Sequence, residues 1–302
     1  MKVLRLALPI IMVLFLFTAY VHAEEAAPAA AAPAAAAEAP KVEEAKVTGS
    51  AGVAVLNRYI FRGYEISTKS VVIEPTITLN YKGFSATVWG NLDTDQHQTQ
   101  SFIPGKTADA NGKGVGVGQK SWNETDLTLS YTYNIDKLAL TGGYIYYGTA
   151  YAKQTQELFV SATYDIISHP TLAVNRDVDG YPGTYFNLSF SQSIPVFKLP
   201  TGDVTVDLGA GFGYFVGSSN YWDTFQSSTG AYTGSKYSAL HDGNVKVGLS
   251  FPLGKNVVLQ PIAQYWFPLS SKAKRTVDGV SYNPNGKLDD TFVYAMNLTF
   301  SF

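Results

Sequence analysis

The feature that most constrains this chain is a regular alternation of apolar residues with small or polar ones, which recurs in many segments after Thr48. At the C-terminus, large apolar side chains take every second position from Phe292 to Phe302, and small or polar residues lie between them. Successive side chains of a β-strand point to opposite faces, so each such segment has one apolar and one polar face. The sequence therefore predicts an all-β protein.

The alternating segments predict twelve strands. They lie near residues 49–62, 70–81, 83–92, 121–133, 138–148, 155–165, 170–177, 184–192, 202–214, 238–251, 256–267 and 289–302. Two of them, 83–92 and 170–177, carry short or weak apolar faces, which leaves ten strands as an alternative. Most segments reach the roughly ten residues that a tilted strand needs to cross an apolar band of about 25 Å. Strands of soluble proteins are usually nearer about 5–6 residues long.

The connections between these segments alternate in length. Those after even-numbered strands are short, such as Tyr81–Lys82–Gly83, whereas those after odd-numbered strands include the long stretches 93–120, 215–237 and 268–288. Aromatic residues on the apolar faces, Tyr59 and Phe61 among them, collect at the strand ends with aliphatic residues between. Two aromatic girdles around an aliphatic band are typical of a bilayer-spanning barrel. We therefore predict a transmembrane, antiparallel, up-and-down β-barrel in the outer membrane of a Gram-negative bacterium, with both termini in the periplasm.

The N-terminus predicts export. Residues 1–5 carry two basic side chains, Leu6 to Val21 is almost wholly apolar, and small residues precede a cleavage site after Ala23. This pattern predicts a signal peptide over 1–23, with an uncleaved membrane anchor as the alternative. Residues 24–47 are rich in Ala, Pro and Glu and predict a flexible periplasmic spacer, so that the barrel takes up 48–302. A mature N-terminus other than Glu24, measured by mass spectrometry, would refute the cleavage site.

Residues with the chemistry for catalysis or metal binding are few. The chain has no cysteine, which excludes disulfides, thiolate metal sites and a lipoprotein anchor. His97 and His169 lie in predicted connections and His241 at a predicted strand start. We interpret all three as ordinary polar loop residues, because no serine or other nucleophile is placed to pair with them. The glycine-rich run 112–118 lacks the strand and helix of a phosphate-binding loop, and 177–180 lacks the later ligands of a calcium loop. No catalytic, cofactor or metal site is predicted, and the formal charge of −2 argues against a nucleic-acid partner.

One motif resembles a known family. The run Asn57–Arg58–Tyr59–Ile60–Phe61–Arg62–Gly63 closely resembles the motif that opens the barrel in the TorF-type porin family of proteobacteria. Further matches lie at 88–91, 124–127, 157–160 and 180–186, so the resemblance spans roughly 48–302. The long 93–120 stretch and the spacer are unlike the family's core. The resemblance implies a porin role and defines no substrate.

The polar faces of the strands predict the pore lining. The charged residues predicted to face inward are Arg58, Arg62, Glu74, Asp126, Glu157, Asp207 and Lys246. Twelve strands about 4.8 Å apart and tilted by about 40° give a backbone radius of roughly 12 Å, and side chains reduce the lumen to a radius of about 5–7 Å. A turn centred near Ile66 would place Arg58 opposite Glu74 and form a charged constriction near the extracellular mouth.

These features predict a porin for passive diffusion of small hydrophilic solutes. Three basic against four acidic lining residues predict weak ion selectivity. The alternatives are a non-conducting structural or adhesive barrel that acts through its loops, and a lipid-modifying barrel enzyme. Expected partners are outer-membrane lipid and the barrel-assembly machinery, for which Phe300 and Phe302 form the predicted recognition signal. No cofactor is predicted, and the sequence names neither the solute nor the oligomeric state.

Overall fold

The computed structural model describes residues 46–67, 70–96, 119–150, 153–226, 229, 231–274 and 288–302. The predicted signal peptide with its cleavage site at Ala23, the spacer up to residue 45, His97 and the glycine-rich run 112–118 lie outside these residues. None of the helices in the described ranges is long and apolar enough to cross a bilayer.

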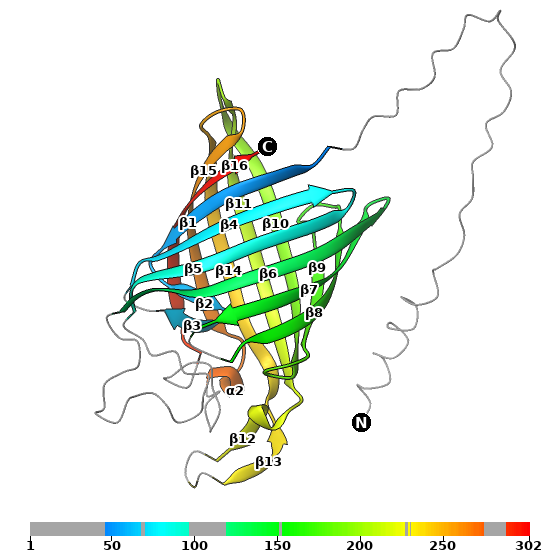
Figure 1. The fold of residues 1–302 in the computed structure, drawn as a ribbon, viewed down its shortest axis with the longest axis vertical. Helices are drawn as coiled ribbons and strands as arrows, with labels where there is room; N and C mark the ends of the chain where they lie inside the picture. Colours follow the sequence, from blue (N-terminus) through cyan, green and yellow to red (C-terminus); the bar gives the residue numbers. More distant parts are fainter. Residues whose placement is uncertain are drawn as a thin grey trace, which may run out of the picture. The chain divides into compact units, whose positions relative to one another are not determined.

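Twelve antiparallel strands close into one barrel (Figure 1). They are β1 (Thr48–Leu56), β4 (Val72–Tyr81), β5 (Phe84–Gln96), β6 (Gln119–Ile135), β7 (Leu138–Thr149), β8 (Thr155–Tyr164), β9 (Thr171–Asp177), β10 (Gly183–Leu199), β11 (Gly202–Gly217), β14 (Ser238–Pro252), β15 (Val257–Pro268) and β16 (Thr291–Ser301). Each pairs with the next barrel strand along the chain, and β1 closes the ring by pairing with both β4 and β16. The predicted all-β barrel of twelve strands is confirmed, and the two weak segments are β5 and β9.

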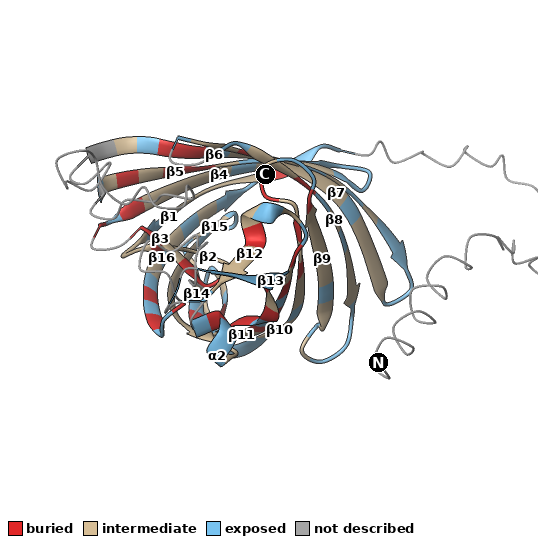
Figure 2. Ribbon diagram, turned by 90° about the horizontal axis from the view of Figure 1, so that it is seen from below, coloured by how far each residue is buried: buried red, intermediate tan, exposed pale blue. Residues whose placement is uncertain are grey.

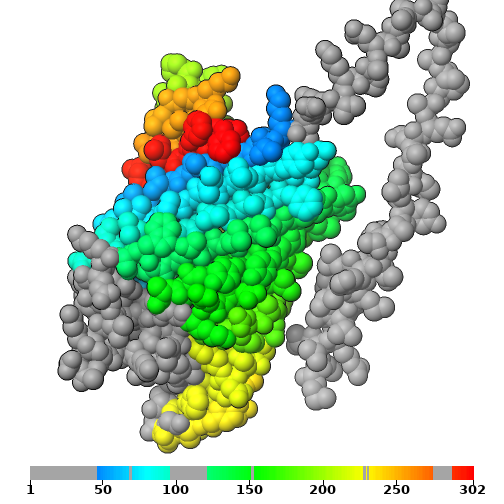
Figure 3. Space-filling model, in the orientation of Figure 1, coloured from blue at the N-terminus to red at the C-terminus, as the bar shows by residue number. Residues whose placement is uncertain are grey.

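The barrel wall has an apolar outer face, as the alternation predicts. On β16 the side chains of Phe292, Tyr294 and Met296 are exposed, whereas Val293, which points the other way, is buried. Neighbouring strands follow one another without a gap in the space-filling view, from β1 in blue through β4 and β5 in cyan to the green of β7 (Figure 3). Exposed apolar surface of this extent marks a membrane-facing wall.

The two ends of the barrel differ in their connections. At one end, called the short-turn end here, tight turns such as Lys82–Gly83 join the strands, and β1 begins and β16 finishes. At the other, the long-loop end, lie the connections 57–71, 97–118, 218–237 and 269–290, together with the shorter 150–154 and 178–182. All the long connections therefore lie at one end of the barrel.

The first predicted strand, 49–62, is wrong in its second half. β1 ends at Leu56, because Asn57 turns its side chain back to accept a hydrogen bond from the backbone N–H of Tyr294, at 2.8 Å. The chain then forms a separate hairpin of β2 (Tyr59–Phe61) and β3 (Tyr64–Ser67), which lies inside the ring of strands (Figure 2). Tyr59 and Phe61 are therefore not part of an outer aromatic girdle.

The tip of this hairpin is a two-residue turn. Phe61 pairs with Tyr64, and the intervening Arg62 and Gly63 both have positive φ, 49° and 79°. Positive φ at both central residues is the geometry of a type I′ turn, which suits the twist of a β-hairpin. A positive φ is uncommon for a residue other than glycine, so the conformation of Arg62 is a local strain that its surroundings must support.

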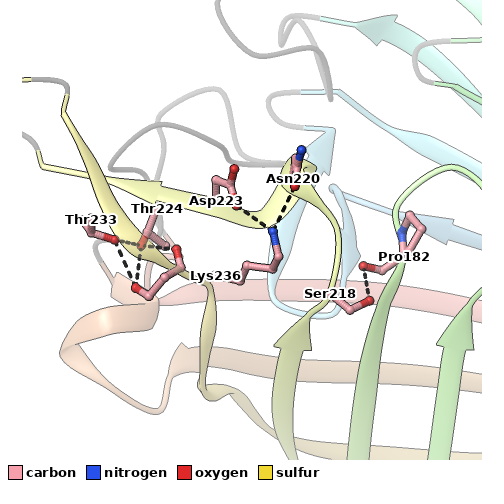
Figure 4. A network of polar contacts seen from close by, with 8 residues as sticks. Pro182, Ser218, Asn220, Asp223, Thr224, Thr233 and Lys236 are labelled. Atoms are coloured by element: carbon pink, nitrogen blue, oxygen red, sulfur yellow. Dashed lines mark hydrogen bonds and ion pairs between the residues drawn. The ribbon is translucent and has the colours of Figure 1, made fainter.

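The connection 218–237 is an ordered loop of its own. It contains the short 3-10 helix η1 (Asn220–Trp222) and a hairpin of β12 (Asp223–Phe225) and β13 (Tyr232–Lys236). The ammonium group of Lys236 donates to Asp223 at 2.8 Å and to Asn220 at 3.2 Å, which ties the two halves of the loop together (Figure 4). Trp222 is turned inward and buried, so the loop is anchored to the barrel by its largest side chain. A single helical turn, α2 (Ser271–Lys274), lies beside β14 at the same end.

Candidate functional site

The hairpin β2–β3 is fixed at its base to the wall beside it. The carboxylate of Asp93, on β5, is fully buried and accepts hydrogen bonds from the hydroxyls of Ser67 and Ser70. These two serines flank the end of β3, where the chain returns to the barrel wall at β4. A charge-assisted anchor of this kind fixes the base of the hairpin to the β4–β5 side of the lumen.

The tip of the hairpin reaches the opposite wall. The ring of Tyr64 lies 4.9 Å from that of His241 on β14. Gly63 packs so closely on the same strand that a Cβ added to it would lie 2.7 Å from the Cβ of Asp242. β14 lies four strands away from β4 around the ring. The hairpin therefore spans the lumen at the long-loop end.

Side chains around the hairpin form a closed apolar cluster, which we call the aromatic plug. Its buried members are Tyr59, Tyr64, Ile66, Val72, Tyr181, Tyr185, Phe215, Trp222, Tyr237, Ala239, Ala273 and Leu288. They come from the hairpin, from strands β4, β10, β11 and β14, and from the connections at the long-loop end. Burial raises the pKa of the Tyr64 phenol well above its usual value, so this group in the plug stays neutral. The plug fills the mouth that the sequence predicted to be a charged constriction.

One ion pair locks the tip of the hairpin to the far wall. The Nη1 and Nη2 atoms of Arg62 donate to the two carboxylate oxygens of Glu157, on β8, at 2.8 and 2.7 Å. Only 15% of the Arg62 side chain and 4% of that of Glu157 are exposed. The guanidinium lies 4.7 Å from the ring centre of Phe61 and 4.5 Å from that of Tyr185, and Tyr147 donates to Glu157 at 3.0 Å. We call this set the Arg62 latch.

The predicted pairing of Arg58 is wrong. Ala54, not Arg58, lies opposite Glu74 in the register of β1 and β4. Arg58 instead donates to Glu65 at 2.6 Å within the hairpin, and 29% and 21% of these two side chains remain exposed. The prediction failed because it extended β1 past Leu56 and so centred the turn in the wrong place.

The other predicted lining residues lie on barrel strands. Glu74 on β4 lines a pocket of about 170 Å³ that also borders Trp89, beside the plug residue Tyr59. Asp126 on β6 pairs in register with Trp89 and so points to the same side of the wall. Lys246 on β14 is exposed. Whether these residues line a conducting pore stays a prediction.

Asp207, on β11, lies toward the short-turn end. Its carboxylate accepts hydrogen bonds from the hydroxyls of Ser193 and Ser250, at 2.7 and 2.5 Å, and from the amide of Gln260, at 2.8 Å. These donors stabilise the charged carboxylate by hydrogen bonding rather than through a basic partner. Asp207 therefore cross-links β10, β11, β14 and β15 on their inner face.

The inner face near the short-turn end is rich in neutral hydroxyls. Three cross-strand pairs of threonines share hydrogen bonds of 2.8–2.9 Å: Thr78 with Thr87, Thr132 with Thr141, and Thr163 with Thr171. Hydroxyls can both donate and accept, so such a surface suits water and neutral polar solutes. This half of the lumen differs in kind from the aromatic plug at the other end.

His241 does lie near the start of a strand, but its interpretation as an ordinary polar loop residue is wrong. Its ring is fully buried on β14, where Nδ1 shares a 2.6 Å hydrogen bond with the hydroxyl of Tyr237. His169 does lie in a connection, between β8 and β9, 3.2 Å from Asp165. The segment that begins like a calcium loop is a tight turn, because the carboxylate of Asp177 accepts the backbone N–H groups of Asp179 and Tyr181.

Sequence reasoning missed the wall side of the latch. Tyr147 and Tyr185 were not singled out as partners of a charged residue, and neither was Asp93. A usable signal did exist, since Trp89, Tyr147 and Tyr185 are large aromatic residues on the polar faces of their strands. Rings of this size at inward positions are more consistent with a filled mouth than with an open one.

Comparisons with known proteins leave the family open. No protein-family model matches the chain, and no curated protein sequence does either. Among solved structures, the chain is similar to the NanC porin, with 8% identity over 85% of this chain and 100% of that one, at a TM-score of 0.47. The KdgM porin is 11% identical over 84% of this chain and 99% of that one, at a TM-score of 0.45. LpxR from Salmonella typhimurium is 8% identical over 84% of this chain and 100% of that one, at a TM-score of 0.43. At these values the likeness says nothing about function, and the TorF-type resemblance stays a prediction.

Proposed function

We propose that this protein is an outer-membrane channel for small hydrophilic solutes, closed at its long-loop end by the hairpin β2–β3 and opened when that hairpin moves. Outer-membrane barrels place their short turns in the periplasm and their long loops outside the cell. By that rule the plugged mouth faces the exterior, and both ends of the barrel sequence face the periplasm.

The observation that carries the proposal is the contrast between the two halves of the lumen. The interior of an outer-membrane barrel is polar, and it is either a water-filled channel or plugged by loops or a helix. Here the aromatic plug occupies one end, whereas Lys246 and the threonine pairs lie on the inner face of the remainder, with Lys246 exposed. An exposed ammonium group on the inner face requires water around it. The part of the lumen toward the short-turn end therefore resembles a water-filled vestibule.

The hairpin β2–β3 can move without unpairing the strands of the barrel. β2 and β3 pair only with each other and form a two-stranded sheet separate from the barrel. Their links to the wall include the Asp93 anchor, the Arg62 latch and the ring contact of Tyr64 with His241, each of which involves a side chain. Displacing the hairpin therefore leaves the backbone pairing of the twelve barrel strands intact.

The charge that remains in the lumen supports a weak preference for cations. Arg58 and Arg62 are paired with Glu65 and Glu157, so they contribute little net charge. The other predicted lining residues are three acidic ones, Glu74, Asp126 and Asp207, against the single basic Lys246. An acidic excess in a low-dielectric channel favours cations.

Conductance in planar bilayers tests the proposal. The wild-type protein should stay closed most of the time, with brief openings. A variant in which residues 59–66 are replaced by a glycine-serine linker of equal length should conduct steadily, because the plug loses its central element. If that variant folds, as shown by its heat-dependent gel mobility, and still carries no current, the channel proposal is wrong.

The second candidate is a non-conducting structural barrel, and the aromatic plug is the observation that favours it. Twelve buried residues packed across the mouth form a core comparable to that of a small domain. The same measurement separates the two candidates, since a structural barrel remains silent even after the hairpin is replaced. Lipid turnover by the purified protein would identify the enzyme alternative.

A further inference from the structure

We infer that the wall side of the Arg62 latch is a binding site for guanidinium-bearing solutes, which the hairpin fills in this state with its own arginine. The site consists of Glu157, Tyr147 and Tyr185, on three different barrel strands. As a statement about binding it does not depend on conduction. The inference is linked to the proposed function at one point, since a solute bound at this site would displace the hairpin.

The geometry matches a guanidinium group in particular. Both oxygens of Glu157 accept from Arg62, one from each terminal nitrogen, at 2.7 and 2.8 Å. This two-pronged arrangement fits the planar fork of a guanidinium and does not fit the point-like ammonium group. The face of the Tyr185 ring, 4.5 Å from the guanidinium carbon, adds an aromatic surface on which a flat cation stacks.

The wall residues are held in place without help from the arginine. Tyr147 donates to Oε2 of Glu157 at 3.0 Å, and the Tyr185 hydroxyl donates to the two oxygens of Asp242 at 3.0 and 3.1 Å. All four residues belong to strands of the closed barrel, which stays intact when the hairpin moves. The site is therefore preorganised, and preorganisation favours binding of a small ligand.

An empty site would be electrostatically unfavourable. With the hairpin seated, only 4% of the Glu157 side chain is exposed, so its carboxylate has little access to water. The cavity beside it, of about 50 Å³, is also lined by Glu124 and Asp177. Among the described residues that line it, the lysine and arginine side chains are those of Arg62 and Lys153, and Lys153 pairs with Asp179 at 3.2 Å. A buried carboxylate that loses its counter-ion is stabilised by another cation. Removing the Arg62 side chain while the hairpin stays seated thus leaves a site that favours a cation of the same shape.

The test is chemical rescue of the Arg62→Ala variant of the full chain, purified in detergent. The measured quantity is the temperature at which heating in detergent changes the gel mobility of the barrel from that of the unheated, folded form to that of the boiled, unfolded form. Arg62→Ala should lower this temperature, and methylguanidinium should restore it at roughly millimolar concentration, as befits a ligand of so few atoms. Methylammonium and sodium at the same concentration should have little effect. Wild-type protein should not respond, because its site is occupied.

Two controls make the result specific. Arg58→Ala removes the other arginine of the hairpin and should not respond to methylguanidinium, because the Arg58–Glu65 pair is partly exposed and has no aromatic walls. The double variant Arg62→Ala, Glu157→Gln should lose the rescue. If Arg62→Ala does not fold, Arg62→Gln takes its place in the same comparison. Equal rescue by methylammonium, or none by methylguanidinium, overturns the inference, and neither result bears on whether the barrel conducts.

Discussion

Replacing Glu157 by glutamine is the most direct way to weaken the latch while keeping its shape. The change Glu157→Gln removes the negative charge and leaves the guanidinium of Arg62 largely buried without a counter-ion. Breaking a buried ion pair in this way costs about 3–5 kcal/mol. Because Arg62 keeps 15% exposure and still stacks on the ring of Tyr185, we expect the lower end, about 3 kcal/mol. A factor of ten corresponds to about 1.4 kcal/mol, so the ratio of closed to open states should fall about a hundredfold.

The assay is the open probability of single channels in planar bilayers, measured at several voltages. Arg58→Ala is the matched control, since it removes a pair within the same hairpin whose side chains are 29% and 21% exposed. Exposed pairs of this kind contribute about 0–1 kcal/mol, so this variant should change the ratio by less than about tenfold. An unchanged open probability for Glu157→Gln, or an equal change in both variants, would refute the latch.

Further predictions concern the barrel and its lining. The detergent-extracted protein should migrate differently on gels before and after boiling, since a closed barrel has no strand edge from which unfolding can begin; identical mobilities would contradict closure. Deleting Phe302 removes about 2–3 kcal/mol of apolar burial at most, so we expect slow insertion and periplasmic accumulation, and normal surface yield would show that the residue is only structural. Glu74→Gln should shift the reversal potential toward anions by removing a lumen carboxylate, and no shift would place Glu74 outside the ion path. Gly63→Ala should raise the open probability, because φ is +79° and the new Cβ would lie 2.7 Å from that of Asp242, whereas Gly83→Ala, at a turn of similar φ on the short-turn end, should not.

The barrel strands could be predicted because each strand is indicated by residues that are close together in the sequence. The face that a strand residue takes depends only on the alternation along its own segment, so the strands from β4 to β16 were found at nearly their observed positions. Even β9, with seven residues, was found, because turns on both sides confine it. Strand ends were less certain, since β10 runs on to Leu199 and β6 begins at Gln119.

The aromatic plug could not be predicted because it depends on contacts between residues that are far apart in the sequence. Tyr59 and Phe61 continue the alternation of Val53 and Val55, so the hairpin looks like a continuation of the first strand. Its turn is Arg-Gly rather than the Asn-Gly or Asp-Gly that usually indicates a hairpin. The partner of Arg62 lies 95 residues further along the chain, and nothing in the intervening sequence indicates the pairing.

The position of the hairpin in the chain has a consequence for folding. Its residues are among the first of the barrel to leave the ribosome and, in the export that the N-terminus predicts, to cross the inner membrane, yet they bind side chains of β8, β10 and β14, which come much later. Contacts between residues so distant in sequence form slowly, because the chain between them must first be ordered. The hairpin must therefore remain unseated, with its aromatic side chains accessible, until the wall opposite it exists. Seating of Arg62 on Glu157 is then one of the last steps of assembly, and a chain that stops short of β8 exposes an adhesive apolar hairpin to whatever binds unfolded proteins in the periplasm.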